Sequence, residues 1–483
     1  MQFINHTPFP ALAFGGVAQN GESFHVVALR QTFTWNETGE LVFAGEQQPL
    51  CEADEFFGEG LQASVRQESD LCPYKPHCDL IINATAYPPA VLNGKTPHRF
   101  TVGVVVKRPD APAPLPPEPQ GLNPFMPASP EAMVAWRSEM ERLKKSVIPG
   151  ERLVDKTLVI HGERGFVKRA GLLGLAARLL RFGTLGLLRL PTWRLTRPEP
   201  ANALPVRLEH AYGGQCRIDG TSHASSKVPK KHRLTPEQQA EHPDPIHPPV
   251  AHEALAANPA GQGWMRDWYL DATRTTRVRA PRIDDPRHPV TSRHFNQVRT
   301  GRDDADLLVA GLGIRPKGHP ERAALAGTID EKFIRSGAPL PEDFDFAVWN
   351  AAWPDQQVDA LQGDETIELT NLCRREMPGV MEDEQGNSVL KLSMPQYQAY
   401  VLVRFESGQL APMALSTDTL ILEPDARTVA MVLRAVLPVH PPIRCLEVRQ
   451  MARTQWQAAW QGGAGRGSAG PLTQATSGSA AHG

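Results

Sequence analysis

Short runs of β-branched and aromatic residues at both ends of the chain constrain its fold most. Near the N-terminus, SFHVVALRQTFTW (23–35) precedes the turn sequence NETGEL and then LVFAG, which together predict a β-hairpin. CDLIINATAY, HRFTVGVVVK and KTLVIHGERGF (156–166) predict further strands, and the last is expected to pair with its predecessor. The N-terminal part of the chain is therefore expected to be built from sheets.

Strand-like runs return after residue 360, and LILEPDARTVAMV predicts a hairpin that turns at Pro424 and Asp425. The chain has 483 residues and 45 prolines, which favours turns over long helices. We predict a mainly β fold of two β-sandwich-like units with a loop-rich middle and a few short helices. The expected divisions are an N-terminal β unit at 1–214, a middle at 215–358, a C-terminal β unit at 359–455, and a flexible Gly/Ala/Ser-rich tail at 461–483.

An insertion at 109–152 separates two of the N-terminal strands. Its first part, 109–127, contains eight prolines and is expected to be extended. SPEAMVAWRSEMERLKKSV then predicts an amphipathic helix with Ser129 as its N-cap. Its apolar face is predicted to bind a partner protein, because Trp and Met are enriched at interface cores; alternatively, it covers the edge of the protein's own sheet. The residues of that face are Met133, Trp136 and Met140.

Two clusters of metal-ligating residue types occur in the sequence. Cys72, His77 and Cys78 lie within SDLCPYKPHCD, but the C-x₅-C spacing and the missing second ligand pair favour a proline-stiffened turn over a zinc site. His242 and His252 flank a third histidine in EHPDPIHPPVAHE, where the prolines forbid a helix and a solvated loop is expected. No metal and no cofactor is predicted.

Motifs for nucleotide binding or acyl transfer are missing from the sequence. EHAYGG and NPAGQGW place glycines at turn spacing, but neither is a Walker A loop, and no G-x-S-x-G occurs. We therefore expect no enzyme activity and name no catalytic residue. The net charge of −2 also gives no field that would attract nucleic acid, although 277–302 is locally basic.

The sequence contains no run of about 18 uncharged apolar residues, the length that a spanning helix needs. The nearest candidate, 166–190, is interrupted by Arg178 and Arg181; burial against the protein's own sheet is expected, and an interfacial membrane helix is the alternative. The six cysteines and the N-terminal sequence, which lacks a basic region followed by an apolar run, favour a cytoplasmic protein with reduced thiols.

The stretch AGTIDEKFIRSGAPLPEDFDFAVWNAAWPDQQ (326–357) is dense in carboxylates. TIDE matches a capping box in which Thr328 and Glu331 exchange hydrogen bonds, and Gly337 is expected to end the helix. In LPEDFDF, Phe344 and Phe346 would share one face if the segment is extended. Caps and turns explain this stretch better than an acid/base pair does.

Several segments together resemble an adaptor and chaperone family of bacterial type VI secretion, a family built on a domain of unknown function and encoded beside VgrG spike and PAAR-like tip proteins. The resembling segments are NHTPFPA (5–11), VALRQTF (27–33), SDLCPYKPHCDLIINATAY (69–87), KTLVIHGER (156–164), LEHAYGG (208–214), NPAGQGW (258–264), and AGTIDEKF with PLPEDFDFAVWNAAWPDQQ and LQGDE (326–365).

The resemblance implies a cytoplasmic protein that binds a secreted effector and helps to load it onto the VgrG/PAAR spike, without stable membrane insertion. It supplies no catalytic residues. Two alternatives stay open: a structural component of the secretion apparatus, or a metal-dependent hydrolase. Cargo capture and the final location of the chain would separate the adaptor from the structural component, whereas bound metal and a pocket of converging acids would favour the hydrolase.

Overall fold

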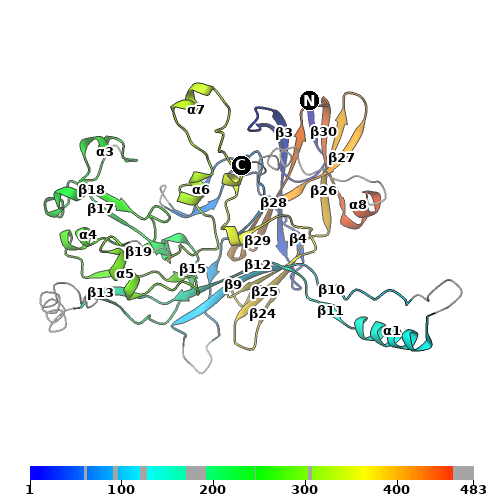
Figure 1. Cartoon of the computed structure of the whole chain (residues 1–483), viewed down its shortest axis with the longest axis horizontal. Helices are drawn as coiled ribbons and strands as arrows, with labels where there is room; N and C mark the ends of the chain where they lie inside the picture. The colour runs from blue at the N-terminus through cyan, green and yellow to red at the C-terminus, as the bar shows by residue number, and fades with distance from the viewer. Residues whose placement is uncertain are drawn as a thin grey trace.

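The structure is a computed structural model and describes residues 1–58, 63–90, 96–119, 128–169, 192–244, 246–302 and 307–460. Strands in several sheets dominate it, and its helices are few and short (Figure 1). The prediction of a mainly β fold is confirmed. The Gly/Ala/Ser-rich tail and most of 166–190 lie outside the described residues, so their predicted states stay predictions. No helix among the described residues is long and apolar enough to cross a membrane.

The largest sheet has seven strands, and both predicted hairpins lie in it. β3 pairs with β4 across the NETGEL turn, and β28 pairs with β29 across a turn at Pro424–Ala426. The order along the sheet is β2 (Ala11–Val17), β3 (Ser23–Trp35), β29 (Thr428–Pro438), β28 (Ser416–Glu423), β7 (Cys78–Ile82) and β22 (Gln357–Val358). The seventh strand, β4 (Leu41–Phe43), pairs with β3.

A six-stranded and a four-stranded sheet complete the main body. In the first, β12 (Arg152–His161) pairs antiparallel with β9 (Arg99–Lys107), as the sequence predicts. Its other strands are β21 (Ile283–Asp284), β23 (Thr366–Thr370), β25 (Ser388–Ser393) and β24 (Val380–Glu382). The four-stranded sheet has the order β1 (Gln2–Asn5), β30 (Ile443–Ala452), β26 (Tyr397–Phe405), β27 (Leu410–Ala414).

Strands from the two ends of the chain are interleaved within these sheets. β9 lies between β12 and β23, and β3 lies beside β29. The two predicted β units thus share their sheets, because the alternating buried residues of β9 and β23, such as Val104 and Leu369, face one common core. Periodicity identifies a strand but not its neighbours.

The middle of the chain forms a lobe with its own core, although the sequence shows little periodicity there. In this lobe β17 (Gln215–Ile218) pairs with β18 (Ala251–Ala254), and the ring of Phe166 stacks on Phe295 with centroids 4.1 Å apart. The other elements that enclose this core are β13 (Gly165–Lys168), β14 (Trp193–Leu195), β20 (Arg277–Arg279), α4 (Asp267–Ala272) and α5 (Ser292–Val298). These elements are too short for a helix or strand period to emerge.

Short elements link these parts. They are β5 (Glu55–Phe56), β6 (Val65–Gln67), β8 (Thr85–Ala86), β15 (Leu204–Pro205), β16 (Tyr212–Gly213), β19 (Gln262–Gly263), α3 (Pro236–Ala240), α6 (Pro320–Ala324), α7 (Glu331–Ser336) and α8 (Arg453–Trp460).

Candidate functional site: a projecting arm, two block junctions and an aromatic groove

The predicted insertion is an arm that projects from the end of the β9–β12 pair. β10 (Ala111–Pro112) and β11 (Val147–Ile148) pair antiparallel at its base, and α1 (Pro130–Leu143) lies at its far end (Figure 1). The Ser129 hydroxyl accepts a hydrogen bond from the N–H of Ala132 at 3.1 Å, so the predicted N-cap is confirmed. None of the residues of α1 is fully buried. The helix is therefore displayed to solvent.

The predicted binding face of the arm is partly used by the arm itself. Met133, Trp136 and Met140 are half-buried, and the indole N–H of Trp136 donates to the carbonyl oxygen of Pro116 at 3.0 Å. This bond holds the helix against the proline-rich segment of the arm. This apolar face therefore packs within the arm, and only part of the face is available to a partner.

Four other apolar residues of the arm face solvent, and sequence analysis missed them. Val134 lies off the stripe of Met133 and Trp136 and is 66 % exposed. The others are Leu115, Val147 and Ile148, which are 48 %, 59 % and 48 % exposed. Exposed apolar side chains on one projecting element are typical of a surface that binds a partner. The pattern of large apolar residues outside the helical stripe was the signal available in the sequence.

The segment with Cys72, His77 and Cys78 leads into β7, and the structure places these three side chains in different surroundings. Both thiols are 2 % exposed, and burial raises the pKa of Cys72 and of Cys78. His77 lies at the surface, where its Nδ1 is 3.1 Å from Oδ1 of Asp359. The three side chains are not brought together.

Asp79, the last residue of this segment, joins it to the carboxylate-rich stretch. Its carboxylate is fully buried and accepts hydrogen bonds from the backbone N–H groups of Ala351 and Ala352 at 2.9 and 3.1 Å. The side-chain amide of Asn350 donates at 3.0 Å, and Nζ of Lys75 at 2.8 Å. Burial alone would lower the pKa of Lys75, but the surrounding carboxylates, Asp79 first, raise it above its ordinary value. Two segments more than 270 residues apart are thus joined by the hydrogen bonds that one buried carboxylate accepts.

The predicted capping box of the carboxylate-rich stretch is wrong. The N-cap of α7 is Asp330, whose side chain accepts from the N–H of Phe333 at 2.8 Å. Thr328 instead donates its N–H and its hydroxyl to the carboxylate of Asp343, at 2.8 and 2.7 Å, and these bonds lower the pKa of Asp343. Gly337 ends the helix in the left-handed conformation, as predicted.

The remaining carboxylates of this stretch each have a different partner. Asp345 caps the short 3₁₀ helix Phe346–Trp349, and Asp355 accepts from Nζ of Lys156 at 2.7 Å. The rings of Phe344 and Phe346 meet edge to face at 5.1 Å. These acids do not converge on one point, so the arrangement fits structural pairing better than acid/base chemistry.

A second junction joins LEHAYGG to NPAGQGW. β16 and β19 pair in parallel, and the side chain of Asn258 donates to the carbonyl oxygens of Leu208 and Tyr212 at 2.9 and 3.0 Å. A Cβ atom at Gly213 would lie 2.1 Å from the carbonyl oxygen of Asn258. The glycines therefore allow close backbone contact between the two segments rather than binding a phosphate.

The histidine-rich loop forms one contact between imidazoles. Nε2 of His242 is 3.0 Å from Nδ1 of His252, and burial lowers the pKa of His252. His247 lies apart from this pair and donates its backbone N–H to Asp244. Across the residues that the structure describes, no group of three or more His, Cys, Asp or Glu side chains could hold a metal ion.

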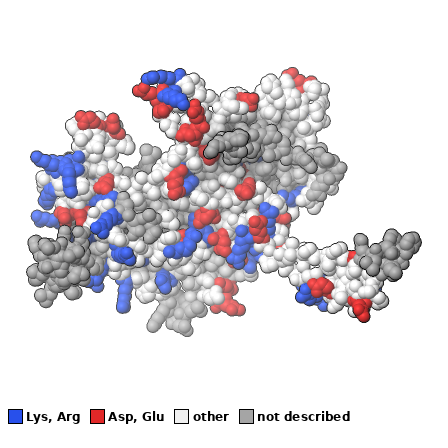
Figure 2. All heavy atoms as spheres, in the orientation of Figure 1, with Lys and Arg blue, Asp and Glu red and all other residues white. Residues whose placement is uncertain are grey.

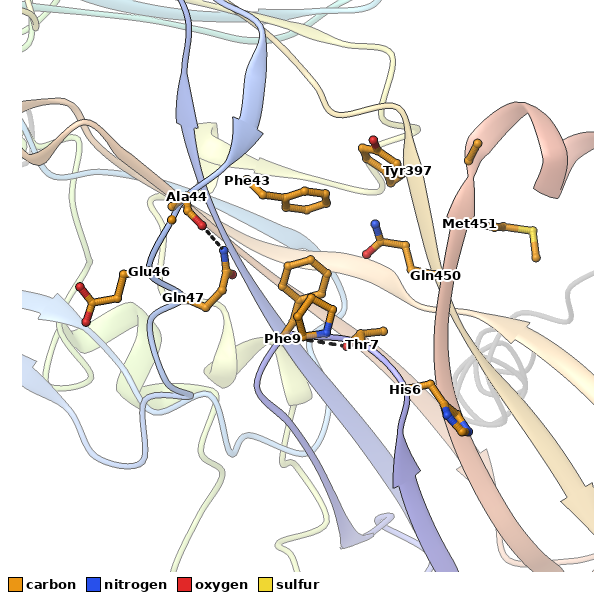
Figure 3. A pocket seen from close by; sticks show the side chains of 13 residues that line it. His6, Thr7, Phe9, Phe43, Ala44, Glu46, Gln47, Tyr397, Gln450 and Met451 are labelled. Atoms are coloured by element: carbon orange, nitrogen blue, oxygen red, sulfur yellow. Dashed lines mark hydrogen bonds between the residues drawn. The ribbon is translucent and has the colours of Figure 1, made fainter.

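An aromatic groove lies where β1, β4, β26 and β30 come together (Figure 3). It has a volume of about 790 Å³. The Phe43 ring lies between Phe9 and Tyr397, with centroids 4.9 and 5.2 Å away, and Tyr397 is 49 % exposed. Polar side chains, Gln450 and His6 among them, line the rest. The groove can hold an apolar group against aromatic rings, with amide donors beside it.

Charges are distributed unevenly over the surface. Figure 2 shows basic side chains gathered over the middle lobe, while acids and bases are mixed around α7. Exposed Lys230, Lys231 and Arg233 belong to this lobe, as do Arg277 and Arg279. This surface suits an acidic partner better than a basic one.

A family model described as an uncharacterized protein conserved in bacteria (DUF2169) matches residues 20–112 and 147–434. The chain belongs to the DUF2169 family. Neither the comparison with curated proteins nor that with solved structures finds a match.

The DUF2169 match divides the candidate surfaces. Both junctions lie within the matched ranges, whereas α1 and the proline-rich segment that begins at residue 113 lie in the interval that the match omits, 113–146. The outer part of the arm, beyond β10 and β11, therefore lies outside the DUF2169 match. The groove combines matched residues such as Phe43 with residues outside the match, among them His6 and Met451.

Proposed function

We propose that this DUF2169 protein is a cytoplasmic adaptor of type VI secretion that binds a cargo effector and helps to load it onto the VgrG/PAAR spike. The resemblance of the segments between Asn5 and Glu365 to adaptors of that system supports the proposal. Several of those segments meet at the two junctions, around Asp79 and Asn258, so their shared role is to hold the body together. The body is then a common scaffold, and specificity belongs to what is added to it.

The observation that carries the proposal is the arm. Its residues 113–146 interrupt the family match, and the arm projects beyond the sheets and exposes Val134, Leu115, Val147 and Ile148. The arm is inserted between two paired strands, and the entropy of closing a longer loop grows only slowly with its length. Such an arm can change with the cargo while the body stays folded. The indole contact with Pro116 keeps the arm ordered before binding, which lowers the cost of association.

Capture from the producing bacterium tests the proposal. The tagged wild-type chain is expected to retain a secreted effector, identified by mass spectrometry, together with spike proteins. A variant with 113–146 replaced by a short Gly/Ser linker keeps β10 and β11. It is expected to melt like the wild type but to bind the effector at least ~10-fold more weakly, a loss of about 1.4 kcal/mol.

Point variants on α1 separate binding from folding. Val134→Ser should weaken effector binding, because Val134 is 66 % exposed and makes little contribution to the packing of the arm. Glu141→Ser, on the same helix with a side chain 69 % exposed, is the matched control and should bind normally. Full binding by the linker variant would remove the arm from recognition. A chain that captures no effector at all would contradict the adaptor role.

A further inference from the structure

Strand β2 forms an open edge of the seven-stranded sheet. It pairs with β3 on its inner side, and the described part of the chain places no strand against its outer side. Its sequence, ALAFGGV, has no charge and no proline, and its pairing with β3 runs without a bulge. Proteins usually protect such an edge with charges, prolines or bulges, because unpaired backbone groups invite another strand. This edge carries none of these protections.

The hydrogen-bond pattern of the hairpin shows which backbone groups face outward. Arg30 donates its N–H to the carbonyl oxygen of Pro10 at 3.0 Å, and Ala18 donates to Glu22 at 2.9 Å. Both pairs continue the β2–β3 register, so the even-numbered residues of β2 bond to β3. The odd-numbered residues direct their N–H and C=O groups to the free edge; they are Ala11, Ala13, Gly15 and Val17. Gly15 and Val17 are exposed.

The outward groups are complementary to those of an identical strand. When two copies of β2 run antiparallel with Ala11 opposite Val17 and Ala13 opposite Gly15, all the outward groups pair about a twofold axis. A shift of two residues in either direction leaves the outward groups at one end of each strand without a partner in β2. One register therefore satisfies the whole edge.

The side chains also fit this register. Phe14 faces Phe14 of the second copy in a non-hydrogen-bonded pair, where cross-strand side chains come closest. Leu12, which is 41 % exposed, faces Gly16, which leaves room for it. No charged residue lies on the strand, so like charges do not oppose each other. The edge thus fits a second copy of itself in backbone and in side chains.

We propose that β2 is a homodimer interface, through which two copies of this chain join their seven-stranded sheets across a twofold axis. The strand precedes the range of the family match, which begins at residue 20. The inference does not depend on the adaptor function. In the dimer, the apolar edge of β2 is covered by a second copy of β2, whose backbone groups are complementary to its own.

Sedimentation velocity of the full chain tests the dimer, with two substitutions at Gly15. Proline removes the outward N–H and places a ring on the edge, whereas alanine keeps the N–H, and its Cβ would meet only the carbonyl oxygen of Phe24 at 3.9 Å. At micromolar concentrations the wild type and Gly15→Ala should sediment with twice the mass of the chain, and Gly15→Pro with the mass of one chain. A monomeric wild type, or a dimeric Gly15→Pro, would overturn the proposal.

A disulfide cross-link tests the register without relying on the proline variant. Two Phe14→Cys residues would face each other with Cα atoms about 4.5 Å apart, within the span of a disulfide. Two Leu12→Cys residues would be about 13 Å apart, because four residues separate them along the strand. The native cysteines are all buried. With diamide as the oxidant, Phe14→Cys should give a covalent dimer and Leu12→Cys should not; equal yields, or no dimer from Phe14→Cys, would refute this register.

Discussion

Replacing Asp79 by asparagine should destabilise the whole body, because this carboxylate joins two distant segments. Oδ1 accepts from Asn350 and Ala352, and Oδ2 accepts from Ala351 and Lys75. An amide turns one acceptor oxygen into a donor group, so in either orientation two of these four donors lose their acceptor. Nζ of Lys75, whose side chain is 7 % exposed, would also lose its counter-charge.

Removing one partner of a buried ion pair costs about 3–5 kcal/mol. At about 2.1 cal/mol/K per residue, the unfolding entropy of a chain of 483 residues is roughly 1 kcal/mol/K. Dividing the loss of free energy by this entropy gives a fall in melting temperature of about 3–5 °C, if the body unfolds as one unit. Differential scanning calorimetry at neutral pH measures this shift. The control is Asp359→Asn: Asp359 pairs with His77, but its side chain is 98 % exposed, and an exposed pair contributes about 0–1 kcal/mol.

A double variant tests the cause of the loss. Lys75→Met combined with Asp79→Asn removes both charges, so it should be less destabilised than the sum of the two single variants. If Asp79→Asn melts within error of Asp359→Asn, Asp79 does not hold the two segments together and the reasoning fails.

Three further predictions concern other parts of the body. Hydrogen bonds from Arg404 and Arg449 hold the pKa of Glu447 at about 2, below its ordinary 4.5, so its stabilising contribution is present above pH 4.5 and is lost as the pH falls towards 2. Glu447→Gln should therefore melt below the wild type at neutral pH and approach it in acid; a difference independent of pH would contradict this. Asp330→Ala should destabilise α7 by about 1 kcal/mol, seen as faster amide exchange at 331–336, while Glu331→Ala should leave that exchange nearly unchanged. After purification in zinc-containing buffer, the wild type and Cys72→Ser should contain the same amount of zinc, because Cys72 and Cys78 are buried while His77 is at the surface. Bound zinc that is present in the wild type and lost in Cys72→Ser would refute this prediction.

Local features of the fold could be predicted from the sequence because nearby residues determine them. The β3–β4 and β28–β29 hairpins, the Ser129 cap and the Gly337 helix end all depend on residues a few positions apart. The N-cap of α7 is an instructive failure. Thr328 and Asp330 are both good N-cap residues, and the choice between them is made by Asp343, fifteen positions later, which takes both donors of Thr328.

Contacts between distant segments could not be predicted. The Asp79 junction and the aromatic groove each bring together residues from distant parts of the chain, such as Phe9 and Tyr397 in the groove. The hydrophobic periodicity of a strand does not indicate which strands pair with it. On the arm, the helical stripe predicts Trp136 as part of the apolar face but not its contact with Pro116, which lies 20 positions earlier in the chain.

If this chain loads a cargo effector through its arm, export of that effector must depend on residues 113–146, and a secretion assay measures this dependence. The producing bacterium would carry the wild-type chain, the variant with 113–146 replaced by a linker, or no copy, and the effector, the spike protein and the chain itself would be quantified in cells and in the medium. We expect the chain to stay in the cells, spike protein to reach the medium in all three strains, and effector export to fall at least ~10-fold without the arm, in line with the weaker binding. Undiminished effector export in the strain without the chain, or the chain itself in the medium in proportion to the spike, would contradict it.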